Sequence, residues 1–473
     1  MTAPTIHLTL VPGIALAEAD GSLAVNGRRF DLPLTGLTPG SIAALRSLAD
    51  GPVEEDALAA PVVAAEGLRG LMALERAKFQ LHELGLVRRT ALHDGVPLAT
   101  LHPMTPGPAF VSGAVVPGRL YALSRFAWLR RGEGGLELEC PLSTARLLCH
   151  DGRVAALAAA LAVPRSVEEA ASLAGLPDAV AAALIDMFLH VRAAAAVGND
   201  TSAESDLAHP LAGWEFHDLL FHARSRQGRH DAPYGATFPM KGRVPPPPLS
   251  APRRWAHDIP LHMPDLDALR ARDLPFAEVV ERRRSVRRYA EAPVTVAQLG
   301  EFLYRTARVK HVLSTPPGEM ELSLRPYPGG GAIHELEIYA VVGGCAGLER
   351  GLYHYDPVGH RLGLVVPENG QTAELLEIGW RTADRQSRPQ VFFVITARFR
   401  RLQWKYQSVV YAVIMKNVGV LYEAMYLTAT AMGLAPCSLG GGVVDPFCRA
   451  VGLDPFEEAP VGEFMLGSTE RAA

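Results

Sequence analysis

Cysteine is scarce in this chain of 473 residues, which has five cysteines and no Cys-x-x-Cys pair. An odd number of dispersed cysteines argues against a disulfide framework, and the missing pairs argue against a zinc site. We therefore predict reduced thiols and no bound metal. His217, His222 and His230 do not change this prediction, because His217 and His222 are five residues apart and do not share one helical face.

Long apolar runs and a secretory signal are also missing. Met1–Leu10 has no basic stretch followed by an apolar one, and the most apolar segment, Val154–Val163, is too short to span a bilayer. The formal net charge is -4, so the chain lacks the excess of positive charge that is typical of proteins that bind nucleic acid. We predict a cytoplasmic globular protein of two or three domains, without a membrane or nucleic-acid partner.

Two small α/β units are predicted before residue 206. The first spans residues 1–100, and the second, residues 110–205, repeats its plan of strands followed by helices. Gly-rich residues 131–135 form a predicted hairpin turn, and Ser166 with Glu169 matches a helix capping box. In the second unit we expect strands at Tyr121–Leu129 and Leu136–Cys140, and helices at Val154–Leu161, Ser166–Leu173 and Ala179–Ala195.

Units of this kind resemble winged helices, and their role stays open between two hypotheses. One is the docking of a peptide or protein by strand addition at a sheet edge, and the other is the bracing of a dimer. DNA binding ranks last because neither unit shows a basic recognition helix.

A linker is predicted over residues 206–260. It contains four consecutive prolines, Pro245–Pro248, which favour a polyproline II conformation and separate the N-terminal units from the C-terminal part of the chain. From residue 261 to 473 helical patterns alternate with apolar strands, which predicts an α+β domain.

A basic cluster opens the C-terminal domain, with five arginines among residues 282–288 around Ser285. These like charges repel one another, and a phosphate group would relieve the repulsion, because arginine binds phosphate oxygens bidentately and a serine hydroxyl adds a donor. A solvated basic face is the alternative interpretation.

Two glycine loops come after the basic cluster. Gly329–Gly331 precedes an apolar strand, Leu336–Val342, and Gly440–Gly442 comes after a long helical pattern, Val409–Met432, which Gly433 is expected to end in the left-handed conformation. Glycine lets backbone N–H groups approach a flat ligand where a Cβ would collide. A plain flexible turn is the alternative. The first loop is neither a dinucleotide fingerprint nor a P-loop.

The strings RRRSVRRY, RPYPGGGAIHELEIYAVV, GLYHYDP and GLAPCSLGGG occur in this order. Together they resemble the SagB-type dehydrogenases, a branch of the nitroreductase-like FMN flavoproteins, over about residues 276–467. The upstream string WEFHDLLFHARSRQGRH is also similar to that branch. The resemblance implies a homodimer that exchanges helices and binds FMN at its interface.

Site residues are implied by the same resemblance. The FMN phosphate and ribityl chain would be held by Arg283, Arg284, Ser285 and Arg287. The isoalloxazine ring would be covered, from the neighbouring subunit, by Pro328, Gly329, Gly330 and Gly331. The ring would be faced near its N5 by Leu439, Gly440 and Gly441. The catalytic pair of azoline oxidases would correspond to Lys405 and Tyr406.

Two positions depart from the family pattern. Gly329 stands where family members commonly have serine, and Gly442 stands where an aromatic residue is often found. The first change removes a side-chain donor near the flavin, and the second is expected to open the ring edge.

The function implied is FMN-dependent oxidation of thiazoline or oxazoline rings to thiazoles or oxazoles in a ribosomally made peptide, with dioxygen as the final electron acceptor. The implied partners are the azoline-containing precursor peptide and a cyclodehydratase complex. A nitroreductase or ene-reductase that uses NAD(P)H and a non-catalytic peptide-binding subunit are the rivals. A transcriptional regulator is the least favoured.

Overall fold

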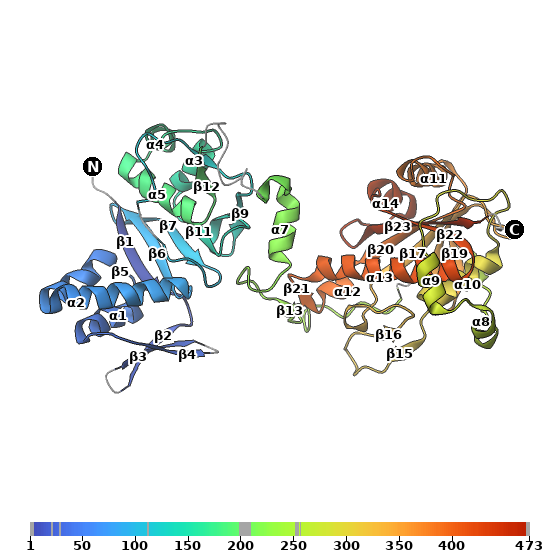
Figure 1. Ribbon diagram of the computed structural model, residues 1–473, viewed down its shortest axis with the longest axis horizontal. Coiled ribbons are helices and arrows are strands. Elements are labelled where there is room, and N and C mark those ends of the chain that lie inside the picture. Colours follow the sequence, from blue (N-terminus) through green and yellow to red (C-terminus); the bar gives the residue numbers. More distant parts are fainter. Residues whose placement is uncertain are drawn as a thin grey trace. The chain divides into compact units, whose positions relative to one another are not determined.

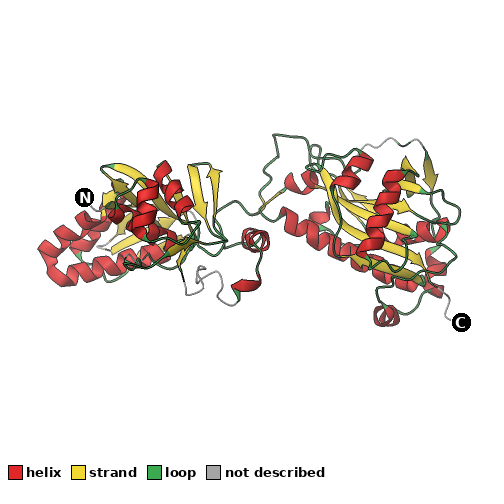
Figure 2. Cartoon of the chain, turned by 90° about the horizontal axis from the view of Figure 1, so that it is seen from above, coloured by secondary structure: helices red, strands yellow, loops and turns green. Residues whose placement is uncertain are grey.

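The computed structural model describes residues 4–19, 22–27, 30–110, 113–197, 210–250, 255 and 257–469. The predicted linker at 206–260 therefore lies partly outside the described residues. The chain divides into two compact units, residues 1–232 and residues 233–473, and both place helices against antiparallel strands (Figure 2).

One sheet organises unit 1. Its seven strands lie in the order β5-β1-β6-β7-β11-β10-β9, so both predicted N-terminal units contribute to it, and β7 pairs with β11 where they meet. The strands are β1 (Thr5–Leu10), β5 (Val53–Glu54), β6 (Val87–His93), β7 (Val96–Pro103), β9 (Trp128–Gly132), β10 (Gly135–Glu139) and β11 (Ala145–Cys149). A separate three-stranded sheet holds β2 (Ala15–Ala19), β3 (Ser22–Gly27) and β4 (Phe30–Leu34).

Helices of unit 1 pack on this framework. They are α1 (Pro39–Asp50), α2 (Glu55–Glu83), α3 (Gly152–Ala160), α4 (Val167–Ala174), α5 (Asp178–His190) and α7 (Phe216–Arg224). Among the described residues, α2 is the helix long and apolar enough to cross a bilayer, and α4 with α5 would count only as a pair bent by 105°. Within the protein, α2 buries Leu58, Leu74 and Leu81 in a core shared with β1.

The predicted local signals in unit 1 are partly right. Ser166 caps α4 and Glu169 completes the capping box, as predicted. The strand predicted at Tyr121–Leu129 is wrong, because a turn from Ser124 to Ala127 separates β8 (Tyr121–Leu123) from β9. The last predicted helix ends at His190, since Arg192 takes a positive φ of 55° and the chain continues as strand β12 (Ala194–Ala196).

Unit 2 is an α+β domain, which confirms the predicted fold class. Its seven-stranded sheet has the order β14-β19-β18-β17-β20-β23-β22, and every pairing is antiparallel. The strands are β14 (Asp258–Pro260), β17 (Leu336–Val342), β18 (Gly351–Asp356), β19 (Arg361–Pro367), β20 (Val391–Arg398), β22 (Leu434–Leu439) and β23 (Glu458–Ser468). The bounds of β17 are those predicted.

Two layers of helices cover this sheet (Figure 1). One face buries residues of α10 (Val296–Ala307) and α13 (Val410–Ala431), and the other buries residues of α11 (Gly370–Thr382) and α14 (Asp445–Val451). The remaining elements are β13 (Gly235–Ala236), α8 (Leu266–Arg272), α9 (Phe276–Arg282), β15 (His311–Leu313), β16 (Leu322–Leu324), η2 (Gly330–Ala332), α12 (Phe399–Gln403) and β21 (Tyr406–Gln407).

Helix α13 is the element that organises the candidate site. It matches the predicted helix to within one residue at each end, and Gly433 comes after it with a φ of 67°, as predicted. Only Lys416 and Glu423 are charged among its 22 residues. Both charged residues are exposed, and among the apolar residues Tyr411 and Val420 remain 49% and 36% exposed.

The proline run belongs to unit 2 and packs against its buried arginines. Arg401, which is fully buried, donates from Nη1 to the carbonyl oxygens of Pro247 and Pro248 at 2.8 and 2.5 Å, and Arg398 donates to Pro248 at 3.0 Å. Proline carbonyls keep their acceptor capacity although the ring removes the N–H, so a polyproline segment suits buried guanidinium groups.

Candidate active site

The arginine cluster lies against strand β22. The backbone N–H of Val286 donates to the carbonyl of Pro436 at 2.8 Å, which fixes the segment just ahead of the second glycine loop. The Arg283 guanidinium carbon lies 5.3 Å from the centroid of the Tyr426 ring, a cation–π contact. The basic segment thus packs on the C-terminal part of α13 and on β22.

These guanidinium groups are poorly neutralised. Arg282 pairs with Glu278 on α9, but no carboxylate of the described residues pairs with Arg283, Arg284 or Arg287. Arg283 and Arg284 are exposed, and Arg287 is half-buried. Three adjacent cations without a carboxylate suit a polyanion such as a phosphate monoester.

A hydroxyl network joins this cluster to the second glycine loop. Tyr426 Oη lies 2.8 Å from Ser285 Oγ and 3.1 Å from Ser438 Oγ, and it accepts a hydrogen bond from the Ser438 N–H at 2.8 Å. Leu439 is buried, and the loop after it is exposed, with open space where side chains at Gly440 and Gly441 would be. The predicted phosphate residues and the predicted ring-facing residues are therefore neighbours within one chain.

The first glycine turn meets the predicted catalytic pair. Gly331 has a φ of 64°, and a Cβ there would lie 2.5 Å from Tyr406 Oη and 3.1 Å from Lys405 Nζ. Gly330 donates its N–H to Asn417 Oδ1 on α13 at 3.1 Å, and Pro328 is exposed at the start of the turn. The structure thus brings Gly331, Lys405 and Tyr406 together at the N-terminal part of α13.

Lys405 and Tyr406 are held by backbone pairing and aromatic contacts. Tyr406 belongs to β21, which pairs with β13 through Ala236. Lys405 Nζ lies 5.3 Å from the Tyr406 ring centroid and 5.8 Å from that of Phe238. Both rings lie at distances from the Lys405 ammonium group that are typical of cation–π contacts.

Buried polar groups pack against the first glycine turn. Asn417 Nδ2 donates to both carboxylate oxygens of Glu335 at 2.9 and 3.1 Å, and burial raises the pKa of Glu335. Burial, helped by Arg325 and Arg401, lowers the pKa of His334 to about 3. A Cβ at Gly329 would lie 2.9 Å from His334 Nδ1, so this ring fills the space that a serine side chain at position 329 would need.

The two groups of residues stand apart along α13. Asn417, at the first glycine turn, and Tyr426, at the arginine cluster, are nine positions apart, which corresponds to about 14 Å of helix. One chain therefore carries two separate groups of predicted site residues, which we name after the roles predicted for them. We call Arg283, Ser285, Tyr426, Ser438 and the 439–441 loop the phosphate half, and Gly329–Gly331 with Lys405 and Tyr406 the catalytic half.

A cavity of about 440 Å³ lies beside the phosphate half and contains a residue that the sequence did not single out. Its walls come from α13, the second glycine loop and β23, and Glu463 is the one charged residue among those that line it. Glu463 is only 7% exposed, and burial raises the pKa of its carboxyl to about 7. Glu463 belongs to no cluster or motif in the sequence, so the sequence offered no signal that could have found it.

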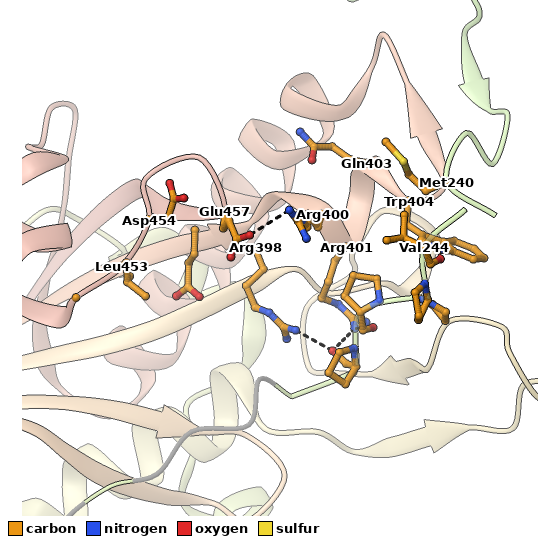
Figure 3. Close-up of a pocket in the computed structure, with 16 residues that line it drawn as sticks. Met240, Val244, Arg398, Arg400, Arg401, Gln403, Trp404, Leu453, Asp454 and Glu457 are labelled. Atoms are coloured by element: carbon orange, nitrogen blue, oxygen red, sulfur yellow. Dashed lines mark hydrogen bonds and ion pairs between the residues drawn. The ribbon is translucent and has the colours of Figure 1, made fainter. Parts of the chain in front are cut away.

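A larger hollow of about 890 Å³ lies elsewhere in unit 2, along the proline run (Figure 3). Arg398, Arg400 and Arg401 line it, together with Trp404, but no predicted site residue does. Arg398 and Arg401 are already bonded to proline carbonyls, and Arg400 pairs with Glu457 at 3.1 Å. We therefore place the candidate active site at the two half-sites.

Neither a disulfide nor a cluster of metal ligands occurs among the described residues. All five cysteines are free, as predicted, and all five are buried. Within the described ranges, no group of three or more His, Cys, Asp or Glu side chains is placed to hold a metal ion. His217 lies beside Asp218, and the His222 ring packs 5.5 Å from that of Trp214.

Two family patterns match the chain. The cyanobactin oxidase ThcOx pattern matches residues 121–231, and the nitroreductase family pattern matches residues 280–468. A relative from Methanocaldococcus jannaschii that carries the name nitroreductase is 26% identical over 186 residues, which are 38% of this chain and 83% of the relative. The trifolitoxin-processing protein TfxB of Rhizobium leguminosarum bv. trifolii is 32% identical over 145 residues, 29% of this chain but only 38% of TfxB.

Solved structures with a similar chain path include a nitroreductase-type protein of Ralstonia eutropha, at 23% identity and a TM-score of 0.36, covering 50% of this chain and 99% of that one. Another is the Escherichia coli microcin synthetase McbBCD complex with truncated pro-MccB17, at 18% identity and a TM-score of 0.33, covering 54% and 92%. The two family matches agree with the resemblance of the motifs to the SagB-type dehydrogenases: a match to the cyanobactin oxidase pattern precedes a match to the nitroreductase family pattern.

Proposed function

We propose that this protein is an FMN-dependent dehydrogenase that oxidises azoline rings in a ribosomally made peptide to the aromatic azoles. The observation that carries the proposal is the pairing of a carboxylate-free arginine cluster with a glycine loop, joined by the Ser285–Tyr426–Ser438 hydroxyls. Such an arrangement fits a phosphate group attached to a flat ring.

FMN fits the residues that are present. Arg283, Arg284 and Arg287 would hold its phosphate with Ser285, and the open space at Gly440 and Gly441 leaves room for the ring against the loop backbone. When bound, FMN would supply a two-electron acceptor for a hydride, which amino-acid side chains lack. Dioxygen is the proposed final acceptor of the electrons.

A homodimer would complete each site. Since the phosphate half and the catalytic half lie apart along α13 in one chain, we propose that the catalytic half of a second copy, including Pro328–Gly331, covers the ring bound to the first. Val420 and, on the opposite side of the helix, Tyr411 are apolar residues exposed on α13, and they support a contact of this kind because exposed apolar side chains mark interaction surfaces.

Lys405 and Tyr406 would act on the substrate ring. Their side chains converge on Gly331, so a ring bound at this turn would meet both an ammonium group and a phenol. Tyr406 would orient the ring or relay a proton, and Lys405 would exchange a proton with it.

The substrate is proposed to be an azoline-containing precursor peptide. The ThcOx pattern over residues 121–231 and the kinship with a trifolitoxin-processing protein support a peptide, and unit 1 supplies sheet edges at β5 and β9 where an extended segment could add. A cyclodehydratase complex, which forms azolines, is the proposed source of this substrate.

The direct test uses the purified full-length protein and an azoline peptide. We expect a yellow protein that releases FMN and a mass loss of about 2 Da for each ring oxidised, because aromatisation removes two hydrogens. Lys405→Ala should keep the yellow colour and lose turnover by about 100-fold, since positioned acid–base groups contribute on this scale.

Other outcomes would favour the rivals. Bleaching of the flavin by NADPH without azoline oxidation would support a nitroreductase or ene-reductase. A colourless protein that cannot be reconstituted with FMN, yet binds the peptide, would support a non-catalytic subunit. Undiminished oxidation by Lys405→Ala would remove Lys405 from the mechanism.

A further inference from the structure

The first glycine turn is attached to helix α13 by one buried side chain. Asn417 is 6% exposed, and its Oδ1 accepts the N–H of Gly330 at 3.1 Å. The turn comes close enough for this bond because Gly330 has no side chain, and a Cβ there would lie 2.5 Å from Cγ1 of Val413 on the same helix. The backbone of the turn therefore packs directly against α13.

Glu335 determines which way the Asn417 amide faces. Asn417 Nδ2 donates to both carboxylate oxygens of Glu335, at 2.9 and 3.1 Å, and Glu335 is fully buried. An amide has a donor end and an acceptor end, whereas a carboxylate only accepts, so the donor end must face Glu335. The acceptor end is thereby directed at Gly330.

A buried arginine holds the other end of the turn. Arg401 on α12 donates to the carbonyl oxygen of Ile333, from Nη2 at 2.6 Å and from Nε at 3.2 Å. The segment therefore has a hydrogen bond to α13 at Gly330 and hydrogen bonds to α12 at Ile333. A segment fixed at both ends argues against the plain flexible turn that the sequence alone allowed.

Gly331 lies between these two attachment points. It is the residue whose missing side chain leaves room for Tyr406 Oη and Lys405 Nζ. It also follows directly after Gly330, so a shift of the Gly330–Asn417 hydrogen bond would move the surface against which the proposed catalytic pair lies.

We propose that Asn417 and Glu335 are positioning residues of the catalytic half. Glu335 orients the Asn417 amide, and the amide fixes the glycine turn at the height that aligns Lys405 and Tyr406. The catalytic purpose of this arrangement rests on the proposed function. Neither side chain touches the substrate ring in this proposal, because both act through the turn.

The cost of burying these groups supports a role in orientation. Burial raises the pKa of Glu335, while the Asn417 donor and the charges of Arg325 and Arg401 oppose that rise. A buried carboxyl group is expensive to keep, and a fully hydrogen-bonded polar network specifies one arrangement that apolar packing would leave free.

The test reverses the polarity of the Asn417–Glu335 contact. In Asn417→Asp, one oxygen still accepts from Gly330, but the other meets the Glu335 carboxyl group, so two acceptors face each other. In Asn417→Asp/Glu335→Gln, the new amide supplies the missing donor. Glu335→Gln alone keeps an oxygen that can accept from Asn417 Nδ2.

The kinetic comparison uses full-length proteins loaded with FMN, with the flavin content of each measured before azoline oxidation is followed at about pH 8. Asn417→Asp should lose about 100-fold in kcat, because misaligned catalytic groups cost this much. Glu335→Gln and the double variant should both stay within about threefold of wild type. Gln371→Glu is the control, since it adds the same charge at an exposed position of α11.

Asn417→Ala is the second variant, because it removes both hydrogen bonds without adding a charge. It should lose kcat as Asn417→Asp does, and it should gain nothing from Glu335→Gln. Rescue confined to the Asp variant would show that the polarity of the contact matters, which general damage to the core would not produce.

A further comparison shows whether the effect passes through Lys405. Residues that act as one unit are strongly non-additive, so Asn417→Asp should cost less than about threefold in kcat when Lys405→Ala is already present. A role confined to stability would lower kcat by the same factor in both backgrounds.

Hydrogen exchange needs neither flavin nor substrate. In the apoproteins, the Gly330 amide should exchange about tenfold faster in Asn417→Asp and Asn417→Ala than in wild type, because its hydrogen bond is weakened or lost. The double variant should restore the protection. Mass spectrometry of the peptide that covers residues 326–335 measures the exchange.

The outcomes separate the two proposals. If wild type binds no FMN and oxidises no azoline, the proposed function fails, and hydrogen exchange still judges whether Asn417 and Glu335 fix the turn. If wild type is active but both Asn417 variants keep its kcat, or Glu335→Gln fails to restore kcat and protection to Asn417→Asp, this inference is overturned.

Discussion

Gly331 holds a left-handed backbone against the two residues proposed to act on the substrate. Its φ of 64° is strained for any L side chain, and its missing Cβ leaves room for Tyr406 and Lys405. Gly331→Ala should therefore destabilise the protein by about 1–2 kcal/mol and reduce azoline oxidation by about 100-fold, because displaced catalytic groups lose their alignment. Denaturant unfolding and steady-state kinetics measure the two effects.

Gly370 supplies the matched control for that substitution. It begins α11, has open space where its Cβ would be and shows no positive φ. Gly370→Ala should change stability by less than about 0.5 kcal/mol and leave oxidation unchanged. Equal effects of the two substitutions would contradict the role given to the turn.

At the residue scale, the sequence indicated candidate site residues but not their surroundings. The arginines, the glycine loops and Lys405–Tyr406 stood out because each is a cluster with its own chemical signature. Glu463 was missed because a single glutamate in a strand carries no such signature. Its burial and its fit to Gly442 arise from residues 21 positions apart, which only the folded chain brings together.

At the element scale, α13 carries a prediction about assembly. Val420 is exposed on α13, so Val420→Asp would place a charge in the proposed dimer contact and cost several kcal/mol of association. We expect this variant to be monomeric by light scattering and to lose FMN as it dissociates, because half of each flavin site would leave with the partner.

Val358→Asp is the control that tests whether a charge at any exposed valine would dissociate the dimer. Val358 is 54% exposed in the turn between β18 and β19, outside both half-sites, and its replacement should leave the oligomer and the flavin content intact. A monomeric Val420→Asp variant that retains all its FMN would show that one chain binds the cofactor alone.

Elements with a strong periodic signal were predicted almost to the residue, as β17 and α13 show. The break between β8 and β9 was not, because Tyr121–Leu129 is apolar enough to suggest one strand. What ends β8 is a tertiary event: Phe126 turns inward and is fully buried, and the Ala127 N–H closes a turn on Ser124. A local sequence pattern does not predict where a strand ends when tertiary packing determines that end.

At the scale of the whole molecule, the sequence could not show that both predicted N-terminal units share one sheet, because the β7–β11 pairing joins segments more than 40 residues apart. The arrangement of half-sites likewise appears only in the folded chain. From this arrangement we predict that two inactive variants can restore each other's activity in a mixed dimer.

We expect Arg283→Ala/Arg287→Ala and Lys405→Ala to be inactive as pure dimers. In a mixed dimer, one composite site carries both defects and the other carries neither, so the mixture should recover activity from about one site per mixed dimer. Refolding or co-expression with two affinity tags isolates the mixed species for assay. If both halves of a site came from the same chain, mixing would restore nothing.

The same helix also limits how the protein can vary in length. Because α13 is a continuous rod between Asn417 and Tyr426, one residue inserted there would rotate one end against the other by about 100° and lengthen the rod by about 1.5 Å. The glycine turn and the arginines would then point in unrelated directions. Among related sequences, insertions and deletions should therefore accumulate in the turns that flank this helix. The number of residues between Asn417 and Tyr426 should stay constant.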